Sequence, residues 1–461
     1  MIPLQKKKIV QETKNFSIWF VVFFIAAILL RFSTLGRNSL WFDEAWGVFR
    51  AHQPIADTLA GNIEVGRPPL YYAGLHYWVA LVGSSETAVR IPSALASLLN
   101  VLLVYFLGRQ LSSRQVGLVA MSLLAFSPLD VWYGQEVRMY IFVACLGLVV
   151  ANGLVWGHWL AILPVTAALT AGLYVDFPMI PLVIGLSSLF LVYWWKQGYP
   201  NRPFWVWFIS IVVSVVLYQP WWSRFANLLS LLNNIHFFKA TRQTLNLPEF
   251  TASFYAFVMV GAGIALVIFF WLFHRLLQED KIRRFITPVA AFVFIMCSVA
   301  FVWPRFYGLK RVIATGWPYV CLLIAWLLVF WTSNRKQLMW YGSMSISLLA
   351  TLAMLWLVPK DDWRSAVAYI ETYAQPGDVV WLDPTWNIAA YEYYQAKTSA
   401  TYGNPQELEQ LAVSDVWLVA ERFPQNAIPS SESEAWLDGN LQLVEAVPFY
   451  RLEVRHYQLE N

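Results

Sequence analysis

Long apolar runs recur along almost the whole chain, and they constrain its fold more than any other feature. A helix needs about 20 mostly apolar residues to cross the hydrocarbon core of a bilayer. The chain is therefore predicted to be a polytopic α-helical membrane protein. Eleven runs are predicted as spans, at 16–35, 87–108, 115–129, 138–156, 159–176, 178–195, 204–222, 252–273, 286–303, 312–331 and 338–358, the third being the shortest.

The composition agrees with a chain that lies mostly in lipid. Of its 461 residues, 58% are hydrophobic and only 13% are charged, whereas a soluble domain carries roughly 25% charged residues. The net charge of +4 does not indicate a nucleic-acid partner. The basic N-terminus leads into an apolar run without a small-residue cleavage site, which predicts a retained first helix and not a signal peptide. The three cysteines lie in apolar runs and form no disulfide framework or metal cluster.

The basic loops predict how the chain crosses the membrane, because cytoplasmic loops carry an excess of Lys and Arg. The lysines at 6–8 and 14 place the N-terminus in the cytoplasm. Alternation then puts four further basic loops on that side, and the chain is predicted to be a multi-pass protein of the plasma (inner) membrane. The same alternation places on the outer side the segments 37–86, 130–137, 223–251, 304–311 and 359–461.

The composition changes after Pro359, and the last hundred residues are predicted to form a separate unit. KDDWRSAVAYIETYAQPGDVVWLDP predicts a helix, a Pro-Gly turn and a buried strand, and SDVWLVAERF predicts a second strand. Alternating helix and strand patterns favour a small α/β domain, and about 100 residues can bury a core. The predicted domains are a membrane part, 1–358, and an outer-face α/β part, 359–461.

Two adjacent carboxylates, Asp43 and Glu44, stand out in the first outer loop, in the stretch SLWFDEAWGVFRA. Neighbouring residues on a helix point about 100° apart, so the two cannot form a facing dyad. We expect one carboxylate to face a reaction centre while the other anchors the loop. A general base needs direct reach to the proton that it removes. The alternative is that both carboxylates simply solvate the end of a loop.

The rest of that outer loop is predicted to contain two helices along the membrane face. PIADTLAG could form a short helix, and RPPLYYAGLHYWVALVG begins with two prolines suited to a helix start. Its tyrosines and tryptophan favour the level of the lipid headgroups.

A second outer segment, SPLDVWYGQEVRMY, gathers several polar residues between two spans. Glu136 and Tyr140 are four residues apart and are predicted to share a helix face, while Gln135 and Arg138 are three apart. Polar side chains that enter a span usually face a cavity or a partner. The alternative is an ordinary polar loop, including Asp130, with a local Glu136–Arg138 pair.

A third outer segment, WPRFYGLKR, breaks the charge rule with Arg305, Lys310 and Arg311. Guanidinium and ammonium groups suit phosphate oxygens, so a lipid-phosphate headgroup is one predicted ligand. The alternative is that these side chains reach ordinary anionic lipid. Further residues that could contribute to this outer site are Arg224, Lys239 and Arg242 as cations, and Tyr174 and Asp176 at the outer end of a span.

The remaining motifs narrow the chemistry. The six histidines show no metal-ligand spacing. No Walker loop, Rossmann glycine fingerprint or nucleophile elbow is present, so a cytoplasmic nucleotide site has no support. The two adjacent carboxylates could hold a divalent ion, which leaves metal dependence open.

Four stretches in this order carry a family resemblance: SLWFDEAWG, RPPLYYAGLHYW, SPLDVWYGQEVRMY and KDDWRSAVAYI followed by QPGDVVWLDP. Together they resemble the polytopic GT-C glycosyltransferases, in the bacterial branch related to protein O-mannosyltransferases and aminoarabinose transferases. The resemblance extends over nearly the whole chain. It implies a GT-C fold with outer-face juxtamembrane helices and a hexosyl- or pentosyltransferase, similar to the mannosyltransferases. It further implies a donor sugar linked to a polyprenyl phosphate and used without a nucleotide.

The resemblance also implies roles for single residues. The acidic residue that acts as the family's catalytic base maps to Asp43, and the neighbouring acid maps to Glu44. Asp130 stands where relatives often have histidine, and Arg305 matches an arginine of the branch only loosely. The positions implied to line the cavity are Gln135, Glu136, Arg138 and Tyr140, in QEVRMY where the branch has QEARMY, with Arg67 and Tyr71.

The two interpretations combine into one predicted reaction. An acceptor hydroxyl loses its proton to Asp43 as it attacks the anomeric carbon, and the polyprenyl phosphate leaves from the opposite face with inversion. Arg305, Lys310 and Arg311 would stabilise the leaving phosphate. The acceptor could be a lipid, a glycan or a protein. The alternatives are a multi-pass transporter, which would usually show repeats and broken helices at the midplane, or a flippase for lipid-linked saccharides.

Overall fold

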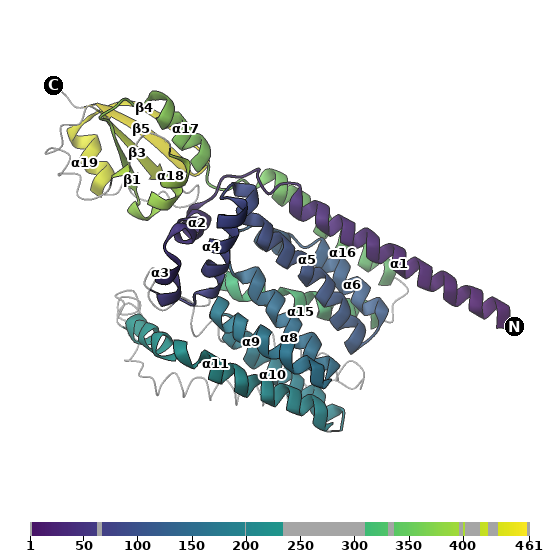
Figure 1. Cartoon of the computed structure of the whole chain (residues 1–461). Helices are drawn as coiled ribbons and strands as arrows, with labels where there is room; N and C mark the ends of the chain where they lie inside the picture. The colour runs from purple at the N-terminus through teal and green to yellow at the C-terminus, as the bar shows by residue number, and fades with distance from the viewer. Residues whose placement is uncertain are drawn as a thin grey trace, which may run out of the picture.

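The computed structural model describes residues 2–61, 67–198, 200–233, 309–330, 336–395, 400–401, 415–422 and 432–458. Within these residues a bundle of long helices joins a small sheet-containing unit at one end (Figure 1). The predicted spans 252–273 and 286–303 lie outside the described residues.

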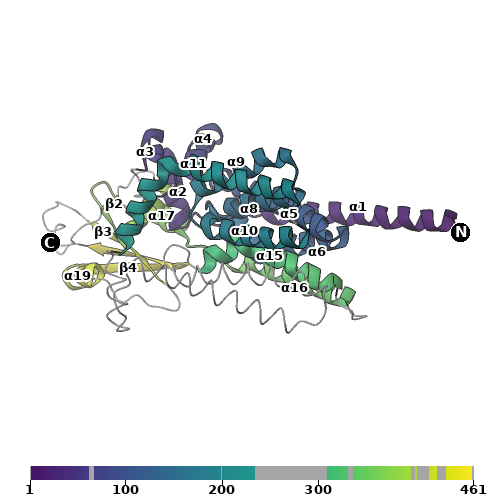
Figure 2. The same ribbon diagram turned by 90° about the horizontal axis from the view of Figure 1, so that it is seen from below.

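Every other predicted span falls on a helix of the bundle. Helix α1 extends beyond the other helices toward the N-terminus, as both ribbon views show (Figures 1 and 2). The bundle helices are α1 (Ile2–Phe32), α5 (Glu86–Leu111), α6 (Arg114–Ala125), α8 (Tyr140–Trp156), α9 (Ile162–Val175) after the 3-10 turn η1 (Trp159–Ala161), α10 (Met179–Lys196), α11 (Asn201–Asn233), α15 (Leu309–Phe330) and α16 (Lys336–Leu357).

Length and composition identify the helices able to cross a membrane. Among the described residues three qualify alone, within α5, α11 and α16, and the bent pair of α6 with α7 (Pro128–Gly134) would add a fourth. The other apolar helices are shorter, at Ser17–Phe32, Tyr140–Trp156, Trp159–Val175, Met179–Trp195 and Ala314–Phe330. The multi-pass helical fold is therefore confirmed, whereas the predicted number of eleven spans is not.

The prediction of one continuous span at 115–129 is wrong. Helix α6 ends at Ala125 and α7 begins at Pro128, with a bend of 61° between them. The side chain of Ser127 accepts a hydrogen bond from the Asp130 backbone N–H at 3.3 Å, and Pro128 occupies the first turn. A serine cap followed by proline starts a new helix, a signal that a count of apolar residues overlooks.

Side chains from other helices satisfy the backbone at this break, as a helix end away from water requires. Arg31 of α1 donates to the carbonyl of Ala125 at 3.0 Å and forms an ion pair with Asp130 at 2.6 Å. Thr351 of α16 donates to the carbonyl of Phe126 at 2.7 Å. Asp130 therefore has a structural partner inside the bundle.

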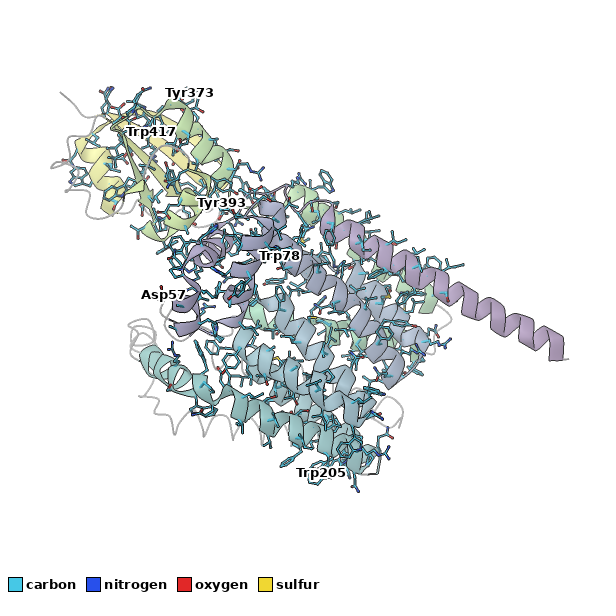
Figure 3. The ribbon with its side chains drawn as sticks, viewed as in Figure 1. Asp57, Trp78, Trp205, Tyr373, Tyr393 and Trp417 are labelled. Atoms are coloured by element: carbon cyan, nitrogen blue, oxygen red, sulfur yellow. The ribbon has the colours of Figure 1, made fainter. Side chains whose placement is uncertain are left out.

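Three short helices, α2 (Phe42–His52), α3 (Ile55–Ala60) and α4 (Leu70–Val82), lie beside the bundle at the end that carries the sheet, with α2 next to the sheet unit (Figure 1). The two helices predicted in this segment are confirmed as α3 and α4, and their place along the membrane face stays a prediction. Trp78, labelled in Figure 3, donates from its indole to the carbonyl of Ala88 at 2.8 Å and so ties α4 to α5. Leu81 is 81% exposed and Tyr77 is 63% exposed, as expected for helices that rest on a membrane surface.

The C-terminal unit contains one mixed sheet in the order β2-β1-β3-β5-β4. The pairs β1–β2 and β1–β3 are parallel, and β3–β5 and β4–β5 are antiparallel. Both predicted strands are confirmed, as β1 and β3. The strands are β1 (Val379–Asp383), β2 (Ala400–Thr401), β3 (Asp415–Glu421), β4 (Gln442–Phe449) and β5 (Leu452–Gln458).

Alternate residues of the sheet face two different helical layers. Val380 and Leu382 belong to a core with residues of α17 (Trp363–Tyr373) and α18 (Ile388–Tyr394). Trp381 packs in a second core with Leu437 of α19 (Glu432–Asn440). Helix α18 also contacts α2, so the sheet unit sits against the segment that contains α2.

Candidate functional site

The two adjacent carboxylates occupy the first turn of α2, where negative charge is favoured by the helix dipole. As expected for neighbours on a helix, they lie in different surroundings. The Glu44 side chain is completely buried, whereas that of Asp43 is 28% exposed. The two carboxylates therefore differ in their access to solvent.

Glu44 is bonded on both of its oxygens. Arg90 of α5 donates to Oε1 at 2.9 Å and to Oε2 at 2.7 Å, and the backbone N–H of Val137 donates to Oε1 at 3.0 Å. Lys360 donates to Oε2 at 3.1 Å. Burial alone would raise the pKa of Glu44, but the charges of Arg90 and Lys360 outweigh it and lower the pKa to about 2. Glu44 is thus an ionised anchor.

Arg90 extends this anchor to the end of the first span. Its guanidinium also donates to the carbonyls of Leu35, Asn38 and Ser39, at 2.6, 2.8 and 3.0 Å. One buried arginine therefore fixes both the segment that enters α2 and the carboxylate in its first turn.

Asp43 is held by Arg138, a residue from the distant segment before α8. Nη2 of Arg138 lies 3.1 Å from Oδ2 of Asp43 and also donates to the Tyr140 hydroxyl at 3.1 Å. Oδ1 of Asp43 has no hydrogen-bond partner among the described residues. The arrangement orients a partly exposed carboxylate and leaves one of its oxygens available.

Residues 135–139 form a turn between α7 and α8, so the predicted helical pairings there are wrong. Arg138 pairs with Asp43, and Glu136 lies 3.7 Å from Lys360 in place of the alternative Glu136–Arg138 pair. Burial raises the pKa of Glu136, although Lys360 opposes the shift. Gln135 faces α1, where its amide donates to the carbonyls of residues 30 and 31 at 3.0 and 3.1 Å.

Two of the predicted cavity residues lie on or before α4. Tyr71 is buried and lies close enough to Arg138 and Glu44 to interact electrostatically with both. Arg67 lines a narrow pocket with Arg50, whose guanidinium lies 4.6 Å from the centre of the neighbouring Tyr72 ring. Tyr71 therefore lies near Arg138, the partner of Asp43, whereas Arg67 lies in a separate pocket whose lining does not include Asp43.

A larger cavity of about 690 Å³ opens between α3, α4, α9 and α11. Arg224 lies on its wall, 4.8 Å from the centre of the Trp221 ring, and Tyr174 also lines it, although this cavity does not include Asp43, whose site Tyr174 was predicted to share. Asp176 is buried and is absent from its walls. The lining is mainly apolar and consists of Leu59, Pro69, Leu70, Ala167, Thr170, Ala171, Tyr174, Leu217, Pro220, Trp221 and Arg224.

Gly61, directly after α3, lets Arg224 of the cavity wall lie close to that helix. Gly61 has a φ of +66°, and a Cβ added there would lie 2.6 Å from a guanidinium nitrogen of Arg224. The close approach and the left-handed conformation both favour glycine at this position. Pro69 lines both the narrow pocket of Arg67 and the large cavity, so the two spaces adjoin.

Several predicted residues cannot be placed. Arg305, Lys239 and Arg242 lie outside the described residues, and the described part of α15 does not include the side chains of Lys310 and Arg311. Their binding of phosphate therefore stays a prediction.

The donor set does not suit a metal ion. No group of three or more His, Cys, Asp or Glu able to hold one occurs in the described ranges. Both oxygens of Glu44 are already bonded to Arg90, Lys360 and the Val137 amide. Asp43 and Glu44 therefore do not fit a shared divalent ion.

Arg90 and Lys360 were not among the predicted site residues. Arg90 is a charge inside a predicted span, where polar residues usually have a specific partner. Lys360 opens KDDW directly after the last span. The position of each residue, one inside a predicted span and one directly after a span, was the sequence signal that could have identified both.

The site can be set beside known proteins. Residues 66–224 match the family model of dolichyl-phosphate-mannose-protein mannosyltransferases. No curated protein sequence matches the chain. Among solved structures, apo ArnT from Cupriavidus metallidurans has a TM-score of 0.50 at 13% identity, over 95% of this chain and 98% of ArnT. The Archaeoglobus fulgidus oligosaccharyltransferase, in complex with Zn and sulfate, has a TM-score of 0.50 at 12% identity, over 87% of this chain and 67% of the enzyme.

Proposed function

We propose that this chain is a membrane glycosyltransferase of the GT-C type, which transfers a sugar from a polyprenyl-phosphate donor to an acceptor hydroxyl at the outer face of the membrane, with Asp43 as the general base. One observation carries the proposal. Of two adjacent carboxylates, Glu44 is buried and bonded on both oxygens, and Asp43 is partly exposed and held by a single guanidinium.

The geometry of Asp43 suits removal of a proton from an acceptor. A base must reach its proton directly, within hydrogen-bonding distance. Arg138 contacts Oδ2, so Oδ1 is the oxygen that would accept the proton of an incoming hydroxyl. Glu44 cannot take this part, because its buried oxygens already accept four hydrogen bonds.

The apolar cavity supports a lipid-linked donor. A chain of isoprene units fits walls of leucine, proline, alanine and tryptophan, and the volume of about 690 Å³ is that of a typical ligand site. Arg224 at the wall and Arg67 in the adjoining pocket supply guanidinium groups suited to phosphate oxygens. The matched family model, by its description, concerns a dolichyl-phosphate-linked donor.

The proposed step balances without a cofactor. The acceptor oxygen forms a bond to the anomeric carbon, its proton passes to Asp43, and the bond from that carbon to the phosphate oxygen breaks. The electron pair leaves with the polyprenyl phosphate, and the anomeric configuration inverts. Fixed positive charge at the leaving phosphate stabilises the transition state, and losing one such contact typically lowers the rate about 10²–10³-fold.

Transfer from defined donors tests the proposal. The full chain in lipid nanodiscs is incubated with membrane extract and radiolabelled undecaprenyl-phosphate mannose, glucose, galactose or aminoarabinose. We expect label from one donor to appear in a lipid, glycan or protein fraction. Folded protein that yields no labelled product with any donor, or that only moves labelled lipid between leaflets, would contradict the proposal.

The cavity is tested with a pair of arginines on α11. Arg224→Gln should raise the KM for the donor because it removes the guanidinium from the cavity wall. Arg202→Gln is the matched control, since Arg202 is exposed at the opposite end of the same helix. Equal KM values for the two variants would exclude Arg224 from donor binding.

A further inference from the structure

Lys360, the first residue of the linker after α16 and Pro359, is a buried lysine with an unusual number of partners. Its ammonium lies 3.1 Å from Oε2 of Glu44, 3.7 Å from Oε1 of Glu136 and 3.4 Å from the carbonyl of Gln135. The same group lies 5.2 Å from the centre of the Trp132 ring. One side chain therefore joins the first turn of α2 to the turn at 135–138.

Such a burial is costly without compensation, because an ammonium loses its water on leaving solvent. Lys360 is only 8% exposed, so its carboxylate partners replace that water. The turn that it contacts contains Val137, which donates to Glu44, and Arg138, which holds Asp43. A cation at this point sets the position of both residues.

The unit that follows Lys360 is bound to the same outer loop. Ser39 donates to the carbonyl of Asp361 at 2.5 Å, and the backbone N–H of Leu40 donates to the Tyr394 hydroxyl at 2.7 Å. Tyr393, labelled in Figure 3 where the sheet unit meets the bundle, donates to the carbonyl of Ser84 at 2.6 Å. The sheet unit thus holds both ends of the segment that contains α2.

We propose that Lys360 is a positioning residue, through which the C-terminal unit holds the turn at 135–138 against α2 and so sets the Asp43–Arg138 geometry. This inference rests on the proposed role of Asp43 as the base. Lys360 itself touches no reacting atom, and its effect passes through Glu44 and Glu136.

The first test separates positioning from binding. Lys360→Met keeps most of the unbranched apolar stem of the side chain and removes its charge. We expect kcat for sugar transfer to fall about a hundredfold, the scale of a misplacement near 1 Å, with the donor KM changed less than twofold. Lys360→Arg should recover most of the loss. An unchanged kcat in folded Lys360→Met, or a rise in KM alone, would overturn the proposal.

The pH profile gives a second readout. Glu136 is surrounded by Lys360, Arg138, Glu44 and Asp43, and burial raises its pKa. Without Lys360, ionisation of Glu136 at higher pH would leave an unbalanced buried charge. Activity of Lys360→Met should therefore fall as pH rises, and the added substitution Glu136→Gln should remove that fall. Parallel profiles for wild type and Lys360→Met would contradict the role.

Amide hydrogen exchange tests the inference without catalysis. The Val137 amide is protected by its bond to Glu44, so Lys360→Met should speed exchange in peptides over 135–138 at least tenfold. The control Arg364→Gln breaks the more exposed pair between α17 and Glu86 of α5 and should leave these peptides unchanged. Equal exchange in wild type and Lys360→Met refutes the inference, whereas failure of sugar transfer in wild type refutes only the proposed function.

Discussion

Replacing Glu44 by glutamine tests whether the buried charges around the first turn of α2 stabilise the folded chain. The substitution keeps the shape of the side chain but removes its charge. Arg90 would then be buried without its anion, and Lys360 would keep only the Glu136 carboxylate, at 3.7 Å. Breaking a buried ion pair from one side typically costs about 3–5 kcal/mol.

The pKa of Glu44 gives an independent magnitude. Its pKa falls from the ordinary 4.5 to about 2 in the folded chain. At about 1.4 kcal/mol for each unit, this corresponds to about 3 kcal/mol of stability. Because the folded pKa is depressed, the contribution is complete above pH 4.5 and is lost as the pH falls toward 2. The cost of breaking a buried ion pair and the pKa shift therefore both predict that Glu44→Gln lowers the unfolding free energy by about 3 kcal/mol near neutral pH.

Unfolding by SDS in mixed micelles, followed by tryptophan fluorescence, measures this loss. The matched control is Glu86→Gln, which gives up the pair with the 45% exposed Arg364 but keeps an amide oxygen that can accept from the Tyr394 hydroxyl, so its loss should stay below about 1 kcal/mol. The difference between wild type and Glu44→Gln should shrink between pH 4.5 and pH 2. A loss below about 1 kcal/mol at neutral pH, or a difference independent of pH, would refute the reasoning.

Three further predictions concern other parts of the chain. Arg31→Met leaves Asp130 buried without its cation and should lower the unfolding free energy by about 3–5 kcal/mol; a loss under about 1 kcal/mol in the same micelle titration would argue against this pairing. Gly61→Ala puts a side chain on a left-handed residue and toward Arg224, so we expect the unfolding free energy to fall by about 1–2 kcal/mol and the donor KM to rise. Kinetics equal to wild type would count against a close approach of Gly61 to Arg224. Burial beside other carboxylates raises the pKa of Glu421 to about 7 from 4.5. Because the folded chain then keeps a proton that the unfolded chain has lost, the thermal stability of the C-terminal unit should fall as the pH rises from 4.5 to 7. An equal fall in Glu421→Gln would exclude this residue as the cause.

The membrane helices were predictable because their signal is local. Apolar length alone located a helix at each predicted span that falls within the described residues, although only three of these helices are long and apolar enough to cross a membrane alone. The same measure failed at Phe126, where the serine cap and proline of the next residues start α7 at a 61° bend. The error arose because hydropathy ignores the capping groups that decide where a helix begins.

The site was predictable only in part, because its contacts join distant segments. The divergence of Asp43 and Glu44 follows from helix geometry, and so was expected. Their partners were not, since Arg90 and Lys360 lie 46 and 316 residues from Glu44 in the sequence. The turn at 135–139 was mistaken for a helix face because residue spacing says nothing about the N-cap at which α8 begins.

The cavity shows the same limit. Tyr174 and Arg224 were singled out as outer-end residues, and the structure places both on one apolar wall. Their meeting depends on how α9 packs against α11 and on the glycine that lets α3 approach. Tertiary packing of this kind leaves no mark in the spacing of either segment.

The most direct test of the account measures single-turnover sugar transfer by Asp43→Asn in nanodiscs, with bound donor quantified beforehand. Asp57→Asn, on the neighbouring helix α3, is the matched control (Figure 3). A general base typically contributes about 10²–10⁴-fold in rate, so Asp43→Asn should bind donor normally and transfer at least a hundredfold more slowly, while Asp57→Asn keeps the wild-type rate. Transfer by folded Asp43→Asn within tenfold of wild type would contradict the assignment of Asp43 as the base.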